Sequence, residues 1–339
     1  MSGFAGGRLN WIGRLVKSAK RPESDNQKAV AQQRPNMPAE NYAGPCRICG
    51  AMATFTKGEL KNSSHHSDPI FNDRYTMTCS ECESSWCENC PTEAEIGGYY
   101  ARTYKVGRIS DRDLKKWPVW DTRSTQLITL GRMFGAFKAG QVFLDIGPGH
   151  GNALASASQL LPEPRYAVIE FNEPAIAFMR KALGNLAVSH STRGILKRFG
   201  KGGVQFIYSA HCFEHFNVEE LRKQLTPLRE ALADDGVLAL EVPQANVEFF
   251  NRANNHVPHL IFFSAEGLTS FLESCGFDVK VCVGTWGQNP RARNFVARTL
   301  GKIPASDEYK AKLAALNTGD WIGAKPGLVL KCIATKSAG

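Results

Sequence analysis

The most informative stretch of this sequence is Val142-Phe143-Leu144-Asp145-Ile146-Gly147-Pro148-Gly149-His150-Gly151. Its first half is a short apolar run of the kind that forms a buried strand, and the three glycines that follow predict a tight turn. The apolar residues from Ala153 onward predict a helix directly after the turn. In open α/β sheets ligands bind at the carboxyl ends of strands, so this turn is a candidate binding site.

Apolar runs alternate with helical patterns on both sides of this stretch. Strands are predicted at 142–146, 166–171, 204–209, 237–242, 277–283 and 328–334. Helices are predicted at 125–137, 153–160, 174–183, 218–233 and 265–275, and Asp234-Asp235-Gly236 is expected to turn into a strand. The alternation is typical of an α/β fold with a doubly wound, mostly parallel sheet.

The residues of the turn discriminate between cofactors. A nicotinamide or flavin dinucleotide requires Gly-x-Gly-x-x-Gly, whereas residue 152 is Asn and the third glycine comes one residue early. Asp145 also adds negative charge where a dinucleotide would bring phosphates, so a cationic cofactor without phosphates fits better. Glu170 ends the next predicted strand, 23 positions after Gly147, where a carboxylate can accept from both ribose hydroxyls. An ordinary surface glutamate before a helix is the alternative.

From about residue 122 to 336 the chain resembles the class I S-adenosylmethionine-dependent methyltransferases. The resemblance rests on the 145–151 loop, Glu170 and the segments 209–215, 232–243 and 258–264. It implies a doubly wound, mostly parallel seven-stranded sheet and S-adenosylmethionine as cofactor. The implied cofactor-binding residues are Asp145, Gly147, Gly149, Gly151, Glu170, Phe171 and Ala210. Where many relatives have an acid for the adenine amino group, this chain has Ser189-His190-Ser191-Thr192.

Six of the ten cysteines lie between residues 45 and 105. Two C-x-x-C pairs, Cys46/Cys49 and Cys79/Cys82, are separated by 29 residues, and four thiolates can close a tetrahedral Zn²⁺ site. Metal binding adds folding energy, which a module of about 60 residues needs. A disulfide framework is the alternative, against which a cytosolic location argues. The run Cys79, Cys82, Cys87 and Cys90 could also hold a metal or an iron–sulfur cluster by itself.

The N-terminal cysteines are also similar to a family pattern. Methyltransferases of sugars and related metabolites can carry a module with C-x-x-C-G, a later C-x-x-C and then Tyr-Tyr, which matches 46–50, 79–82 and Tyr99-Tyr100 with Tyr104 nearby. The resemblance favours Zn²⁺ on Cys46, Cys49, Cys79 and Cys82. It leaves Cys87 and Cys90 as buried small residues or redox-active extras.

Methyl transfer to a hydroxyl or an acidic carbon is helped by a base. His211, Glu214 and His215 follow a predicted strand at the edge that faces the cofactor, and His256 and His259 precede a segment that resembles a substrate-side lid. Histidine titrates near neutral pH and suits this role. We expect His215, beside Glu214, to be the base and His259 to be the alternative. Each histidine could instead make a structural hydrogen bond.

The chain is basic, with a net charge of +9, and residues 18–44 are polar and contain proline. We expect a disordered basic tail or linker at 1–44, a zinc-binding module at 45–105 and a methyltransferase domain at 106–339. The tail has no run of five or six like charges, so nucleic acid is not a favoured partner. Apolar and basic residues mix at 9–20, which leaves a weak peripheral membrane contact open. No apolar run approaches the roughly 20 residues that cross a bilayer, and we expect a cytoplasmic protein.

These features predict a methyltransferase of a small molecule or glycan precursor, with a sugar nucleotide among the substrates and with transfer to carbon or oxygen undecided. RNA methylation is the alternative, weakened because the chain lacks an Asn/Asp-Pro-Pro-Tyr-like motif. A scaffold that binds the cofactor without turnover is a third hypothesis. The sequence leaves the acceptor and the oligomeric state open.

Overall fold

The computed structural model describes residues 41–60, 68–102, 122–244, 259–285 and 329–338. All of them belong to one compact unit, Ala39–Gly339. Most of the predicted tail, together with Tyr104 and His256, lies outside the described residues. Strand β1 already begins at Asn41, which is earlier than the start of folded structure near Pro45 that the composition predicts.

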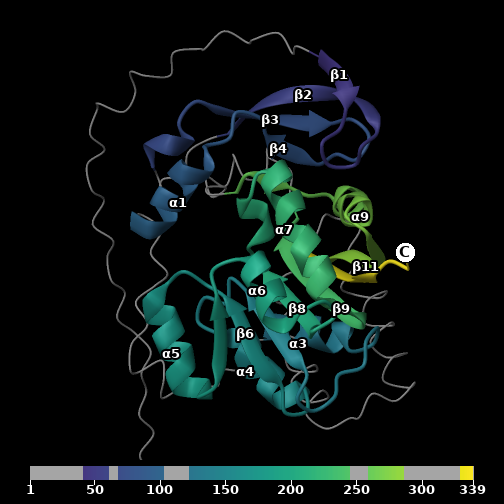
Figure 1. Cartoon of the computed structure of the whole chain (residues 1–339). Helices are drawn as coiled ribbons and strands as arrows, with labels where there is room; N and C mark the ends of the chain where they lie inside the picture. Colours follow the sequence, from purple (N-terminus) through teal and green to yellow (C-terminus); the bar gives the residue numbers. More distant parts are fainter. Residues whose placement is uncertain (1–40, 61–67, 103–121, 245–258, 286–328, 339) are drawn as a thin grey trace, which may run out of the picture. The chain divides into compact units, whose positions relative to one another are not determined.

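A seven-stranded sheet forms the larger part of the fold (Figure 1). Its strands are β5 (Val142–Ile146), β6 (Arg165–Ile169), β7 (Leu186–Ser189), β8 (Val204–Ala210), β9 (Leu232–Pro243), β11 (Phe277–Thr285) and β12 (Val329–Lys336). The order across the sheet is β11-β12-β9-β8-β5-β6-β7. Strands β5 to β9 run parallel, and only β12 runs antiparallel to its neighbours β9 and β11. The predicted α/β fold with a mostly parallel seven-stranded sheet is confirmed.

Helices cover both faces of this sheet. They are α3 (Thr122–Gly131), α4 (Asn152–Leu160), α5 (Glu173–Leu183), α6 (Thr192–Phe199), α7 (Val218–Ala231) and α9 (Ala265–Ser274). Because side chains alternate along a strand, Phe143 packs with Leu127, Leu154 and Met179 of α3, α4 and α5. Its neighbours Val142, Leu144 and Ile146 belong to the core on the other face, with residues of α6, α7 and α9.

Four elements differ from the sequence-based prediction. Strand β7 and helix α6 were not among the predicted elements, because both are short. The residues Asp234-Asp235-Gly236 lie inside β9, where the register jumps from Val204↔Leu232 to Phe206↔Val237, so the expected turn is a bulge in a continuous strand. Helix α3 ends at Gly131, before the predicted end at residue 137; a Cβ at Gly131 would lie 2.5 Å from the ring of Phe206, so this position requires glycine.

The cysteine-rich part forms a second, antiparallel sheet. It contains β1 (Asn41–Pro45), β2 (Met52–Leu60), β3 (Arg74–Cys79) and β4 (Ser85–Cys87), and it is followed by helix α1 (Glu93–Arg102). Its fifth strand, β10 (Ile261–Phe262), comes from the C-terminal half of the chain and pairs with β4. The two parts therefore share a sheet, and a boundary drawn at one point of the sequence cuts through it.

Hydrogen bonds at Ser264 add to this connection. The backbone N–H of Ser264 donates to Ser84 Oγ at 2.9 Å, and its hydroxyl donates to the carbonyl of Cys82. The same hydroxyl caps helix α9 by accepting from the N–H of Gly267 at 2.8 Å. One side chain thus fixes the start of α9 relative to the second C-x-x-C pair.

Candidate functional site

The glycine turn after β5 has the backbone conformation that only glycine adopts easily. Gly147, Gly149 and Gly151 have φ values of +70°, +53° and +73°, and Gly151 is the N-cap of α4. A Cβ on Gly147 would lie 3.2 Å from Cys212 Sγ, so the turn is adjacent to the segment that follows β8. A Cβ on Gly149 would meet nothing within 4 Å. The turn therefore leaves open space above its centre.

Asp145 lies one residue from the end of β5 and is 1% exposed. Its Oδ2 atom accepts no hydrogen bond from any residue in the described part of the chain. Burial, and then the nearby charge of Glu170, raise the pKa of this carboxyl group well above its usual value. A cationic partner would stabilise the ionised form of this buried carboxyl group. A sulfonium cofactor that also carries an ammonium group has the required charge.

Glu170 follows β6 and is fixed by backbone donors. Its Oε1 atom accepts from the N–H groups of Phe171 at 2.7 Å and Asn172 at 2.9 Å. Phe171 is 71% exposed, and its ring stacks on that of His190 with 5.5 Å between the centroids. The backbone carbonyl of Glu170 lies 2.7 Å from Nδ1 of His190. An acid and a flat exposed ring pair are thus side by side at the strand ends.

The structure brings together the four residues predicted on the acceptor side. Glu214 is 1% exposed in the short 3-10 helix η3 (Phe213–His215), and its Oε1 lies 3.5 Å from His211 Nδ1. The same oxygen lies 3.8 Å from Nε2 of His215 and 3.8 Å from Nε2 of His259. His259 reaches this position because the N–H of Leu260 donates to the carbonyl of Glu214 at 2.7 Å. Burial opposes the charge of Glu214, but the three imidazoles hold the pKa of Glu214 below its usual value, and His215 has the largest effect of the three.

A charged network behind His211 is the main feature that the sequence did not predict. Glu241 and Lys331 are 1% and 4% exposed, face each other across β9 and β12, and form an ion pair. Glu241 Oε1 also lies 3.2 Å from His211 Nε2 and 3.8 Å from Nη1 of Arg123. Burial opposes ionisation, yet Lys331 and then His211 lower the pKa of Glu241 to about 2. The signal in the sequence was a Glu and a Lys inside otherwise apolar strands.

His211 and Ala210 end strand β8 beside this network. His211 has a φ of +53°, and its backbone N–H donates to the carbonyl of Glu241 at 2.9 Å. Burial favours the neutral ring, but the adjacent carboxylates of Glu214 and Glu241 raise the pKa of His211 to about 9. His211 is therefore protonated at neutral pH, which makes it a weak candidate for a base. Ala210 pairs with Glu241 in the ladder.

The four cysteines of the two C-x-x-C pairs lie together. The sulfurs of Cys46, Cys49, Cys79 and Cys82 are within 4.8 Å of one another, and Cys46 Sγ is 4.0 Å from Cys82 Sγ. Zn–S bonds of about 2.3 Å in a tetrahedron put sulfurs about 3.8 Å apart, so the group fits Zn²⁺. Backbone N–H groups of Ile48 and Cys49 point at Cys46 Sγ, and that of Glu81 at Cys79 Sγ, each at 3.4 Å. Such donors stabilise thiolates.

Cys87 and Cys90 belong to a different environment. Cys87 packs with Phe71, Tyr99 and Leu260 in a small core, and Cys90 Sγ donates to the carbonyl of Cys87 at 2.9 Å. Neither cysteine belongs to the four-sulfur group, although Cys79 and Cys82 do. The described residues therefore bring together the two C-x-x-C pairs and not the run from Cys79 to Cys90.

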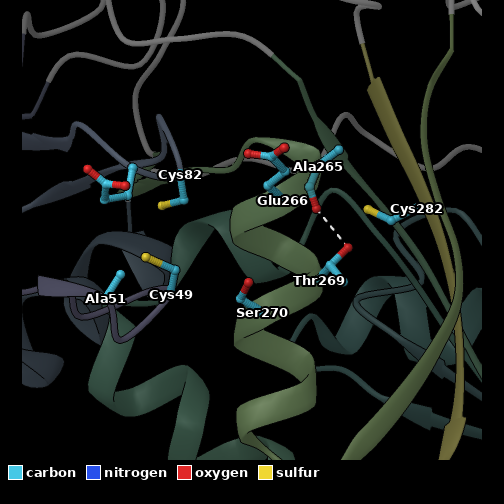
Figure 2. A pocket seen from close by; sticks show the side chains of 9 residues that line it. Cys49, Ala51, Cys82, Ala265, Glu266, Thr269, Ser270 and Cys282 are labelled. Atoms are coloured by element: carbon cyan, nitrogen blue, oxygen red, sulfur yellow. Dashed lines mark hydrogen bonds between the residues drawn. The ribbon is translucent and has the colours of Figure 1, made fainter. Parts of the chain in front are cut away.

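A hollow of about 480 Å³ lies beside the cysteine group, lined by Cys49 and Cys82 and by Thr269, Ser270 and Cys282 (Figure 2). Thr269 is held by its hydroxyl, which donates to the carbonyl of Ala265 at 2.8 Å. None of the residues of the glycine turn lines this hollow. The hollow is therefore separate from the glycine turn.

Residues 119–280 match the family model described as a methyltransferase domain, which is slightly less than half of the chain. Among proteins with curated functions, no sequence match is found. In the part of the chain that the structure describes, no helix has the length and apolar character that crossing a membrane requires.

Several solved structures are similar in fold. A S-adenosylmethionine-dependent methyltransferase from Archaeoglobus fulgidus is 21% identical, with a TM-score of 0.41 over 63% of this chain and 95% of that one. The complex between the Haloferax volcanii Trm112 methyltransferase activator and a methyltransferase gives 13% identity and a TM-score of 0.46 over 72% of this chain and 98% of that one. Phosphoethanolamine N-methyltransferase 2 from Haemonchus contortus, bound to S-adenosylhomocysteine, is 16% identical, with a TM-score of 0.40 over 63% of this chain and 52% of that one. Residues 119–280 are thus similar to a methyltransferase domain, and strands β5 to β9 of the α/β sheet lie within them.

Proposed function

We propose that this protein is an S-adenosylmethionine-dependent methyltransferase that acts on a small molecule or glycan precursor. The observation that carries the proposal is the pairing of the buried Asp145 carboxyl group, whose Oδ2 atom has no donor among the described residues, with the space over Gly149 that those residues leave open. A bound S-adenosylmethionine supplies an electrophilic methyl group on a positively charged sulfur. Asp145 stabilises that cationic molecule, and the glycine turn allows the close approach.

The remaining cofactor contacts are assigned to residues at the same strand ends. Gly147 and Gly151 shape the turn, and Glu170 accepts hydrogen bonds from the ribose with the oxygen that its own loop does not use. The exposed Phe171, supported by the stacked ring of His190, offers a flat apolar surface for the adenine. Ala210, at the end of β8, leaves room beside the methyl group. In this proposal the ring of Phe171 contacts the adenine, whereas many relatives use an acidic residue for the adenine amino group.

We assign removal of the acceptor proton to the cluster of Glu214, His215 and His259, with His211 beside them. His215 is the first candidate for the base and His259 the second, because both rings lie 3.8 Å from the buried Glu214 carboxylate that orients them. His211 is a positioning residue, since it is held between Glu214 and Glu241. The acceptor atom, carbon or oxygen, follows from the substrate.

The four-cysteine group is proposed to bind a structural Zn²⁺ in a module spanning residues 45–105, with the methyltransferase domain at 106–339. The proposal is supported by the clustering of the four sulfurs and by the N–H groups aimed at them. Zn²⁺ there would stabilise the loop whose Cys82 carbonyl accepts from Ser264. Four thiolates remain ligands only where they stay reduced, which agrees with a cytoplasmic location.

Calorimetric titration with S-adenosylmethionine, S-adenosylhomocysteine and NAD tests the cofactor. We expect the first two to bind and NAD to give no heat, and binding of NAD alone would refute the assignment. Methyl transfer from labelled S-adenosylmethionine to a panel of nucleotide sugars and to RNA then tests the acceptor. Label in the RNA only would replace the small-molecule proposal with RNA methylation, and binding without transfer to either would favour a scaffold.

A further inference from the structure

Glu214, His215 and His259 form a group with the composition of a metal site. Two of these residues are adjacent in η3, and the third precedes β10, so the group closes only in the folded chain. The Glu214 oxygen and one ring nitrogen of each histidine all lie within 4.8 Å of one another. Two imidazoles and one carboxylate that occupy one face of a transition-metal ion form a common ligand set, which leaves the coordination positions on the opposite face open.

We propose that these three side chains bind a divalent transition-metal ion. Metal–ligand distances of about 2.1 Å put ligand atoms roughly 3.0 to 3.4 Å apart. The Glu214 Oε1 atom lies 3.8 Å from each histidine Nε2, so side-chain shifts of a few tenths of an ångström complete the coordination. These two separations exceed the range of a direct hydrogen bond and leave room for an ion between the ligand atoms.

The state of the Glu214 carboxylate is an independent observation that points to a cation. The residue is 1% exposed, and neither of its oxygens accepts a hydrogen bond from a described residue. Burial disfavours an ionised carboxylate unless positive charge lies close to it, and the protonated His211 ring approaches the Glu214 carboxylate only to 3.5 Å. An ion coordinated by Oε1 supplies that charge at the centre of the group.

His211, Glu241 and Tyr100 lie around the three proposed ligands. His211 lies 3.5 Å from the same Glu214 oxygen through Nδ1, and its other nitrogen lies 3.2 Å from Glu241. The rings of His215 and His259 lie 5.0 Å apart, and Tyr100 packs edge-on against His215 at 6.2 Å. Packing between these rings restricts the orientations that His215 and His259 can adopt.

The inference goes beyond the proposed function, since it replaces the base role of His215 and His259, and it rests on that function for the choice of substrate. An ion held by three ligands has open positions that suit an acceptor with two adjacent oxygens, such as a vicinal diol or a hydroxyketone of a sugar. A hydroxyl bound to the ion has a lower pKa and gives its proton to water more readily. With the ion present, His215 and His259 act as ligands and not as free bases, so the two roles exclude each other.

The experiment counts metal ions in the full-length protein. The chain is first loaded with one Zn²⁺ at the cysteines and then titrated with Co²⁺, followed by calorimetry and by elemental analysis after desalting. We expect wild type to bind a second ion, and His259→Gln to weaken that binding by at least about 100-fold while it keeps the first ion. His190→Gln, which removes a histidine outside the group, should keep both ions.

Two results would overturn the proposal: no Co²⁺ binding by the zinc-loaded wild type, or a second ion of unchanged affinity in His259→Gln. Circular dichroism and retention of the first ion show that the variant is folded. S-adenosylmethionine affinity is measured on the same samples. If S-adenosylmethionine does not bind, the proposed function is wrong, but the number of bound metal ions still tests the metal site. If S-adenosylmethionine binds and no second metal ion does, only the metal site is wrong.

Discussion

Substitution of Gly149 by arginine tests the cofactor site most directly, because the structure separates its effect on stability from its effect on binding. Gly149 has a φ of +53°, and a Cβ there would meet no atom within 4 Å. The added cost is therefore the strain of a left-handed backbone, about 1–2 kcal/mol, with no steric clash. That strain lowers the melting temperature of a domain of this size by roughly 2–8 °C.

Binding of S-adenosylmethionine should change far more. The arginine side chain occupies the open space over the turn and places a positive charge where the proposal puts a cation. We expect a loss of affinity of at least about 100-fold, which corresponds to roughly 2.8 kcal/mol. Isothermal titration calorimetry measures the affinity, and thermal melting of the same samples measures the strain.

Gly140 provides the matched control. It also has a positive φ, +78°, and no atom within 4 Å of an added Cβ, but it lies before β5 instead of after it. Gly140→Arg should therefore lose a similar amount of stability and bind the cofactor like wild type. Wild-type affinity in Gly149→Arg, or an equal loss in both variants, would refute the assignment of the site to this turn.

Three further predictions concern other parts of the molecule. Cys49→Ser should lower the Zn²⁺ content and the melting temperature together, whereas Cys90→Ser should keep the metal; an intact Zn²⁺ stoichiometry in Cys49→Ser contradicts the proposed ligand set. Lys331→Met leaves Glu241 buried without its nearest cation and should cost about 3 kcal/mol in denaturant titrations. Adding Glu241→Leu should recover most of that loss, and an unrelieved double variant would argue against the ion pair as the cause. Burial and Glu170 raise the pKa of Asp145, so its proton persists to higher pH, and a cationic cofactor favours the ionised form. Affinity should therefore rise with pH and binding should release a proton, which calorimetry in buffers of different ionisation enthalpy detects; Asp145→Asn should show neither effect.

The strands and helices that could be predicted are those whose signal is local. The run Val142–Ile146 is apolar except for Asp145 and is followed by glycines, and several neighbouring strands are also mostly apolar. Strand β7 has only four residues, which is too short for a periodic pattern to stand out. The bulge in β9 could not be predicted because Asp-Asp-Gly reads as a turn unless the partner strand is known.

The candidate site divides in the same way. The glycine turn, Asp145 and Glu170 could be named from their spacing along two strands, because parallel strands end at the same edge of the sheet. The grouping of Glu214 with His259 depends on a hydrogen bond between Leu260 and Glu214 that no local pattern encodes. The Glu241–Lys331 pair joins residues 90 positions apart, and each looks like an isolated charge in an apolar run.

Local sequence patterns therefore predicted most of the strands and helices of the larger sheet, the glycine turn after β5 and the types of side chain at the strand ends. These depend on backbone conformation and on the alternation of apolar residues, which act over a few positions. Two features appear only in the folded chain. Strand β10 joins the sheet of the cysteine module, and the buried Glu214 carboxylate lies next to three imidazoles. Burial and distance create those relations, because a charge acquires its partner and its pKa only when distant segments exclude water around it.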